Sequence, residues 1–149
     1  MAQKETKLKE LNEKISSKLN RVMEIKKLLS ELRIIESETE ITNQQIVCQQ
    51  YRSELTSYYT ESLVLVNKIQ TFLESRKSLL MNENPEWKPS KVAAAMRANY
   101  ANHYILLEKA KTLSKVCALL IKDIDSKLKV LSRILTKLLA FSSVKGESL

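Results

Sequence analysis

The stretch Asn82-Glu83-Asn84-Pro85-Glu86-Trp87-Lys88-Pro89-Ser90 interrupts a sequence whose remainder has the character of long helices. It holds both prolines and the only tryptophan of the chain. Proline lacks a backbone N–H and fixes φ, and the residue before it is pushed out of the α region, so a helix ends before Pro85. Ser90 is suited to accept hydrogen bonds from the first free N–H groups of a new helix. The stretch therefore predicts a helical hairpin with antiparallel arms.

The composition excludes most fold classes. One glycine and two prolines in 149 residues leave little turn chemistry for a β-rich fold, and 44% hydrophobic residues are too many for a disordered chain. We predict an all-α protein, an elongated helical hairpin or coiled coil with three long helices. The helices are expected at 3–36, 40–82 and 90–142 of a single domain (1–149), before a flexible tail at 143–149. The alternative is a closed three-helix bundle.

The first predicted helix carries a narrow apolar seam. When Leu8 is placed at heptad position a, the a and d positions are occupied by Leu8, Leu11, Ile15, Lys18, Val22, Ile25, Leu29 and Leu32. A strict a/d seam is typical of a two-stranded contact. Lys18 breaks the apolar pattern, and it either restricts register and partner or extends its ammonium group to water.

The connection between the first two helices has two interpretations. Ile34 and Ile35 are adjacent and residues 36–40 are polar, yet no glycine or proline marks a turn. We favour a helix that runs through with a local change in supercoil. The alternative is a separate second helix with Ser37 or Thr39 as its N-cap.

The two arms of the predicted hairpin carry wider apolar stripes. The heptad register of the first arm reads Ile41, Gln44, Cys48, Tyr51, Leu55, Tyr58, Ser62, Leu65, Ile69, Phe72, Arg76 and Leu79. The register of the second arm reads His103, Leu106, Ala110, Leu113, Cys117, Leu120, Ile124, Lys127, Leu131, Ile134, Leu138 and Phe141. Both arms add apolar residues at a neighbouring position. Stripes of this width are typical of helices that touch two neighbours.

The predicted arms differ in length. At about 1.5 Å per residue, residues 41–81 span about 60 Å and residues 91–141 about 75 Å. The seam of the first helix would then project beyond the hairpin, unless that helix folds back as the third member of a closed bundle. An exposed leucine seam needs a partner in water. The predicted partner-binding residues are Leu8, Leu11, Ile15, Lys18, Val22, Ile25, Leu29, Leu32 and Trp87, the last of which alternatively covers the hairpin end.

The net charge of +8 is concentrated in residues 92–149, which carry ten Lys/Arg and four Asp/Glu. On the predicted third helix, one face opposite the apolar stripe holds Lys115, Lys122, Lys129 and Arg133. Such a basic face could follow a phosphate backbone or a layer of lipid headgroups. The alternative is an ordinary solvated helix face, since no aromatic residues lie between the cations.

Little in the sequence points to catalysis. His103 is the only histidine, and Cys48 and Cys117 form no CxxC pair, so we interpret all three as packing residues. We expect no catalytic residue, no cofactor-binding or metal-binding residue and no small-molecule substrate. The absence of an apolar signal region or a long apolar run predicts an intracellular protein, cytoplasmic or nuclear and not secreted, with no transmembrane helix.

These features predict a non-enzymatic coiled-coil interaction subunit or adaptor of a larger intracellular assembly. Its partner would be a helical protein or a second copy of the chain. The alternative function is a cationic amphipathic helix, around residues 126–139, that binds an anionic membrane surface or a nucleic-acid backbone. The leucines of that segment are equally suited to a bundle core.

Overall fold

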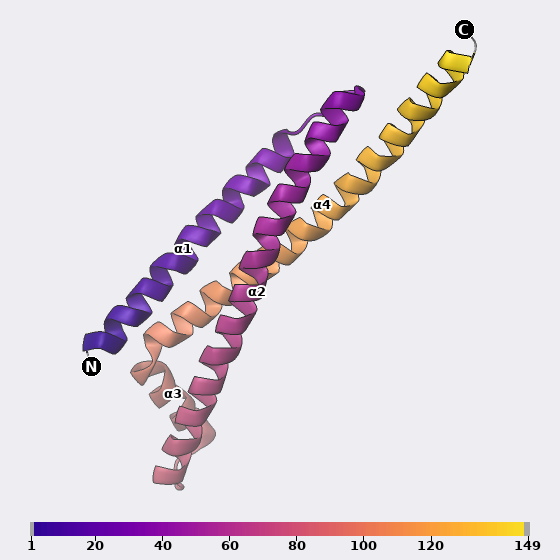
Figure 1. Cartoon of the computed structure of the whole chain (residues 1–149). Coiled ribbons are helices and arrows are strands. Elements are labelled where there is room, and N and C mark those ends of the chain that lie inside the picture. Colours follow the sequence, from indigo (N-terminus) through magenta and orange to yellow (C-terminus); the bar gives the residue numbers. More distant parts are fainter. Residues whose placement is uncertain (1, 148–149) are drawn as a thin grey trace. The chain divides into compact units, whose positions relative to one another are not determined.

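The computed structural model describes the backbone of residues 2–147 and the side chains of residues 3–143. Helices make up 91% of the described residues, with no strand among them, so the all-α prediction is confirmed. Four helices follow one another along the chain (Figure 1): α1 (Ala2–Glu31), α2 (Glu38–Glu83), α3 (Pro89–Asn99) and α4 (Ala101–Glu147). Three long helices are therefore not confirmed, because the third predicted helix is divided into α3 and α4.

The helices pack as two compact units. Unit 1 comprises residues 1–20 and 58–115, and unit 2 comprises residues 21–57 and 116–149. Each unit contains parts of α1, α2 and α4, while α3 belongs to unit 1 alone.

In unit 2, residues 32–37 form a linker between α1 and α2. The favoured continuous helix is therefore wrong, and α2 begins where the alternative placed it. The carbonyl of Ser37 accepts the first helical hydrogen bond, from the N–H of Ile41 at 2.9 Å, which makes Ser37 the N-cap residue.

The linker after α1 is held by a side chain from α2, two residues past the end of the helix. A helix leaves its last carbonyl groups without partners, and a glycine often helps to satisfy them. No glycine is present at this point in the sequence. Instead, the amide nitrogen of Gln44 donates a hydrogen bond to the carbonyl of Arg33.

Gln44→Leu is therefore expected to lower the free energy of unfolding by about 1 kcal/mol, the usual contribution of one such hydrogen bond. The amides of the linker should also exchange faster with deuterium. Urea unfolding and native-state hydrogen exchange measure the two effects. Gln49→Leu, at an exposed position of the same helix, should change stability by less than about 0.5 kcal/mol. Equal effects of the two substitutions would contradict this role for Gln44.

The turn after α2 uses Asn84 and Pro85. Both the backbone N–H and the side-chain amide of Asn84 donate to the carbonyl of Leu80, each at 3.1 Å. The N–H of Trp87 donates to the carbonyl of Asn84 at 3.1 Å. This closes a four-residue turn with proline at its second position, the place where a fixed φ is favourable.

The N-cap of α3 is Lys88, with φ −71° and ψ 152°, and Pro89 is the first helical residue. The N–H of Val92 donates to the carbonyl of Lys88 at 3.2 Å. The predicted N-cap, Ser90, is therefore wrong. Pro89 explains the earlier start, because its missing N–H costs nothing at the first helical position and its φ is already helical.

Tyr100 separates α3 from α4. Its φ of −124° and ψ of 33° lie outside the helical range. The break is brief, since the N–H of Tyr100 donates to Met96 and the N–H of Tyr104 donates to Tyr100. The ring of Tyr100 lies edge-on to Phe72 of α2 at 5.7 Å and to His103 at 5.5 Å, and the latter two rings stack at 4.8 Å. This aromatic cluster packs α2 against the break.

Each unit has its own apolar core. In unit 1 the buried apolar side chains are Ile15, Val66, Ile69, Leu73, Val92, Met96, Leu106, Leu107, Ala110 and Leu113. In unit 2 they are Val22, Ile25, Leu29, Ile41, Cys48, Leu55, Cys117, Leu120, Ile124 and Leu131. Most of these positions belong to the predicted heptad registers. Leu79 also belongs to a predicted heptad register, but its side chain is 48% exposed.

The seam of α1 packs inside the chain. In unit 1, the ammonium of Lys109 on α4 donates to the side-chain oxygen of Asn12 at 2.9 Å. In the same unit, the ammonium of Lys18 forms an ion pair with the carboxylate of Glu61 on α2. The lysine that interrupts the apolar seam therefore has a partner of opposite charge. The predicted overhang is therefore wrong, because the linker returns α1 along α2 as in the closed-bundle alternative. The buried seam residues are Ile15, Val22, Ile25 and Leu29.

At its other end, α4 continues to Glu147, beyond the predicted helix end at residue 142. The expected flexible tail over residues 143–149 is therefore helical up to residue 147. Residues 148–149 lie outside the described residues.

Candidate partner-binding surface

The apolar seam of α4 continues past the point where it is buried. In unit 2, Leu120, Ile124 and Leu131 are at most 5% exposed. Phe141 follows in the same heptad register, yet 65% of its surface is exposed. This part of α4 therefore exposes large apolar side chains, and Leu139 is 51% exposed as well.

The neighbours of α4 in unit 2 end at different levels. α2 lies beside α4 as far as its first residue, since the hydroxyl of Ser142 lies 3.5 Å from the carboxylate of Glu38. α1 ends at Glu31, and the carbonyl of Arg33 in the linker accepts from Gln44 of α2. Figure 1 shows the C-terminal part of α4, in yellow, running on beyond the linker between α1 and α2.

Five residues share one stripe of α4 near its C-terminal end, and we call this stripe the α4 end face. At 100° per residue they fall within one stripe of the helix, on the side turned away from the α2 contacts Ser132 and Ser142. Val130 is 41% exposed and Phe141 65% exposed. The α4 end face comprises Val130, Arg133, Ile134, Lys137 and Phe141.

A cavity of about 230 Å³ lies at the start of the α4 end face, and we call it the end cavity. It is bounded by the linker, α2 and α4, and its lining is mainly apolar. Lys127 supplies the one charge among its lining residues, which are Leu32, Ile34, Gln44, Cys48, Ser126, Lys127, Val130 and Leu131.

The size of the end cavity limits its occupant. An engineered cavity of about 150 Å³ binds benzene, while sites for drug-sized molecules begin near about 300 Å³. A volume of about 230 Å³ lies between these values. The end cavity therefore suits one large apolar side chain better than a whole cofactor or substrate.

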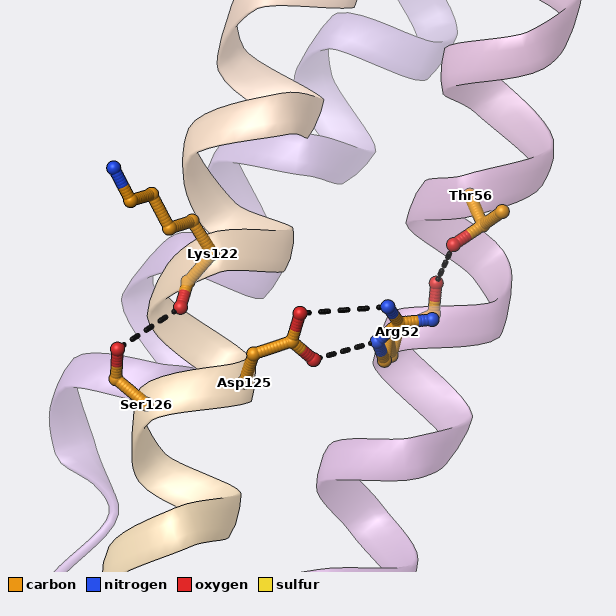
Figure 2. A network of polar contacts seen from close by, with 5 residues as sticks. All are labelled: Arg52, Thr56, Lys122, Asp125 and Ser126. Carbon is orange, nitrogen blue, oxygen red and sulfur yellow. Dashed lines mark hydrogen bonds and ion pairs between the residues drawn. The ribbon is translucent and has the colours of Figure 1, made fainter.

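An ion pair fixes α2 against α4 beside the end cavity (Figure 2). Nε of Arg52 donates to Oδ1 of Asp125 at 2.7 Å, and Nη2 donates to Oδ2 at 3.4 Å. The hydrogen bond from Arg52 lowers the pKa of Asp125. Both side chains are at least 40% exposed, so the pair adds little stability. Its two hydrogen bonds join α2 to α4 immediately before Ser126 and Lys127, which line the end cavity.

Cys48 lines the end cavity, but its thiol is poorly suited to chemistry. The side chain is fully buried, and burial raises its pKa although the nearby ammonium of Lys127 opposes the shift. Cysteine reacts as the thiolate, so a raised pKa lowers its reactivity. Burial likewise lowers the pKa of His103. No group of three or more metal-ligating side chains occurs among the described residues.

The predicted basic face consists of exposed side chains. Lys115 lies in unit 1, and Lys122, Lys129 and Arg133 lie in unit 2. Only Arg133 also belongs to the α4 end face. The sequence analysis did not identify the other residues of the α4 end face as a surface, although Ile134 and Phe141 are in the predicted heptad register of the second arm.

Trp87 is half-buried in the turn after α2, with the ammonium of Lys91 at 4.6 Å from its ring centroid. Val92 and Met96, two expected neighbours, are buried, whereas Met81 is 48% exposed. One face of the indole therefore contacts α3, and the ring remains accessible to a partner.

Trp87→Ala is expected to lower the melting temperature by a few degrees, because partial burial of an indole contributes about 1–2 kcal/mol. As the only tryptophan, Trp87 should also show an emission maximum between the buried and the solvent-exposed limits. Thermal unfolding and fluorescence test both statements. Lys91→Ala serves as the control, since it removes the cation but leaves the ring. A fully solvent-like emission would show that the ring does not pack.

No protein-family model, curated protein or solved structure matches the chain. Among the described residues, no helix combines the length and apolar character needed to cross a membrane. The function is therefore inferred from the residues and their contacts.

Proposed function

We propose that this chain is a non-enzymatic helical interaction subunit or adaptor of a larger intracellular assembly. The observation that carries the proposal is the exposed apolar surface of α4 in unit 2, where Val130, Leu139 and Phe141 are 41%, 51% and 65% exposed. Exposed apolar patches of this kind mark interaction sites, because water contact with them is unfavourable.

The partner surface of the proposal differs from the seam of α1. That seam is largely buried against α2 and α4, so a partner could reach it only after α1 separated from them. Leu8, Leu11 and Leu32 are half-buried and remain partly accessible. The seam as a partner surface stays a prediction, and the proposed function does not depend on it.

A membrane surface or a nucleic-acid backbone is the second candidate partner, and one observation favours it. Residues 127–143 carry four Lys/Arg and no Asp/Glu. However, the apolar groups of this segment are partly used in unit 2, since Leu131 is 3% exposed and Ile134 and Leu138 are half-buried. Less apolar surface remains for a bilayer than the sequence alone suggests.

Native capture from cells of the source organism tests the proposal, using wild type and Phe141→Asp as baits. The change is at an exposed position, so unit 2 should stay folded. Leu119→Asp is the matched control, because Leu119 also lies on α4 and is also 65% exposed. We expect a helical protein that binds wild type and Leu119→Asp directly after purification, and that is lost with Phe141→Asp. Identical captured proteins for all three baits would refute the proposed surface.

A further inference from the structure

We propose, independently of the function above, that the end cavity in unit 2 binds a small apolar carboxylate. The apolar body of this ligand lies inside the cavity, and its carboxylate lies beside the ammonium of Lys127. The end cavity combines a buried apolar floor, an accessible mouth and a single cation. Each of these features restricts the class of ligand.

The end cavity is closed on one side and accessible on the other. Cys48 and Leu131, which form its floor, are 0% and 3% exposed. Ile34 of the linker and Val130 of α4 are 53% and 41% exposed, so they lie at its mouth. A small molecule can therefore enter between the linker and α4 while the helices of unit 2 stay packed.

Lys127 is a cation in apolar surroundings. It lies in the heptad register of α4 between the buried Ile124 and Leu131, and it is itself half-buried. Within residues 3–143, whose side chains the structure describes, no carboxylate forms an ion pair with Lys127. The adjacent Asp125 pairs with Arg52 instead. An ammonium partly removed from water attracts an anion more strongly than an exposed one does.

The polar groups of the end cavity favour a carboxylate over other head groups. The ammonium of Lys127 offers three donors and no acceptor. The side-chain amide nitrogen of Gln44 donates to the carbonyl of Arg33 and carries a second N–H. A carboxylate accepts hydrogen bonds from both groups, a hydroxyl gains no charge attraction, and a second ammonium is repelled by Lys127.

The volume of the end cavity sets the size of the apolar body. An engineered cavity of about 150 Å³ binds benzene, and scaling to the larger cavity gives a body of about six to eight carbon atoms. The volume of about 230 Å³ is that larger cavity. Such a body has the size of one large apolar side chain. Short aliphatic and aryl carboxylates combine this size with the required charge.

Three ligands with one chain length and different head groups test the proposal: hexanoate, 1-hexanol and hexylammonium. Each is titrated into the full-length chain at neutral pH and followed by two-dimensional NMR. We expect hexanoate to bind about tenfold more tightly than hexanol, and hexylammonium to bind more weakly than hexanol. The affinity for hexanoate should fall as salt rises. The largest signal changes should fall on Gln44, Cys48 and Leu131.

Variants test the cation and the mouth separately. Lys127→Met keeps an unbranched side chain but removes the charge, so hexanoate and hexanol should then bind equally. Lys129→Met is the matched control, because Lys129 is an exposed lysine of the same helix outside the end cavity, and it should keep the tenfold preference. Val130→Trp should cover the mouth and weaken hexanoate at least about tenfold. Circular dichroism checks the fold of each variant, and Lys127→Met decides the case if Val130→Trp unfolds.

Equal affinities of wild type for hexanoate and hexanol would overturn the proposal, as would a preference for hexanoate that survives Lys127→Met. Absence of binding up to about 10 mM would do the same, because a ligand of this size that fills a cavity should bind within that range. Phe141→Asp should leave the affinity for hexanoate unchanged, since Phe141 does not line the end cavity. This proposal and the proposed function therefore fail separately.

Discussion

Replacing Ile25 with aspartate is expected to remove more than about 4 kcal/mol of unfolding free energy from unit 2. The side chain of Ile25 is 0% exposed and lies in the core formed by α1, α2 and α4. An unpaired carboxylate placed there loses its hydration, and the same change creates a packing defect. Because a domain is stable by only about 5–15 kcal/mol, the cooperative unfolding transition in urea should be lost or shifted to very low urea concentration.

Met23→Asp is the matched control for this prediction. Met23 lies on the same helix but is 53% exposed, so its substitution should change stability by less than about 0.5 kcal/mol. The pair also distinguishes a seam packed within the chain from a seam that awaits a partner. If Ile25→Asp left unfolding unchanged and only abolished association, the internal packing of α1 would be wrong.

The periodicity of the sequence predicted the buried faces of α2 and α4 because burial follows helix geometry directly. Ile41, Cys48 and Leu55 recur at the spacing of one helical face, and all three are fully buried. No feature of a distant residue is needed for such a prediction. The sequence also predicted the turn before α3, since proline acts on its own backbone.

Two helix ends were not predicted, and both depend on contacts from elsewhere in the chain. Gln44 of α2 holds the linker two residues past the end of α1, and the break at Tyr100 is packed by Phe72 of α2. Neither position contains glycine or proline. Tertiary contacts determine where these helices end, and such contacts cannot be predicted from the local sequence pattern.

The seam of α1 shows a second limit of reasoning from periodicity. A heptad seam indicates that a helix has a neighbour, but it does not show whether the same chain supplies it. In the structure, α1 packs against other helices of the same chain, and its seam is largely buried.

Native Cys117 is expected to react with iodoacetamide at pH 8 at least about 100-fold more slowly than the same thiol in the urea-unfolded chain. Burial raises the pKa of Cys117 from 9.0 to about 11, and the side chain is 0% exposed. The reactive thiolate falls about tenfold for each unit of pKa, before any steric protection is counted. The Cys48→Ala variant isolates this thiol for mass spectrometry. Similar native and unfolded rates would contradict its burial.

The same shift makes the stability of unit 2 dependent on pH. Below pH 9 the Cys117 thiol is protonated in both states, so its contribution to stability is fully present. As pH rises from 9 to about 11, the unfolded chain loses this proton while the folded chain keeps it, and stability falls. The two pKa units correspond to about a 100-fold change in the unfolding constant. Urea unfolding at several pH values should therefore show a steeper loss for wild type than for Cys117→Ala. Parallel pH profiles would show that the thiol ionises equally in both states and is not buried as described.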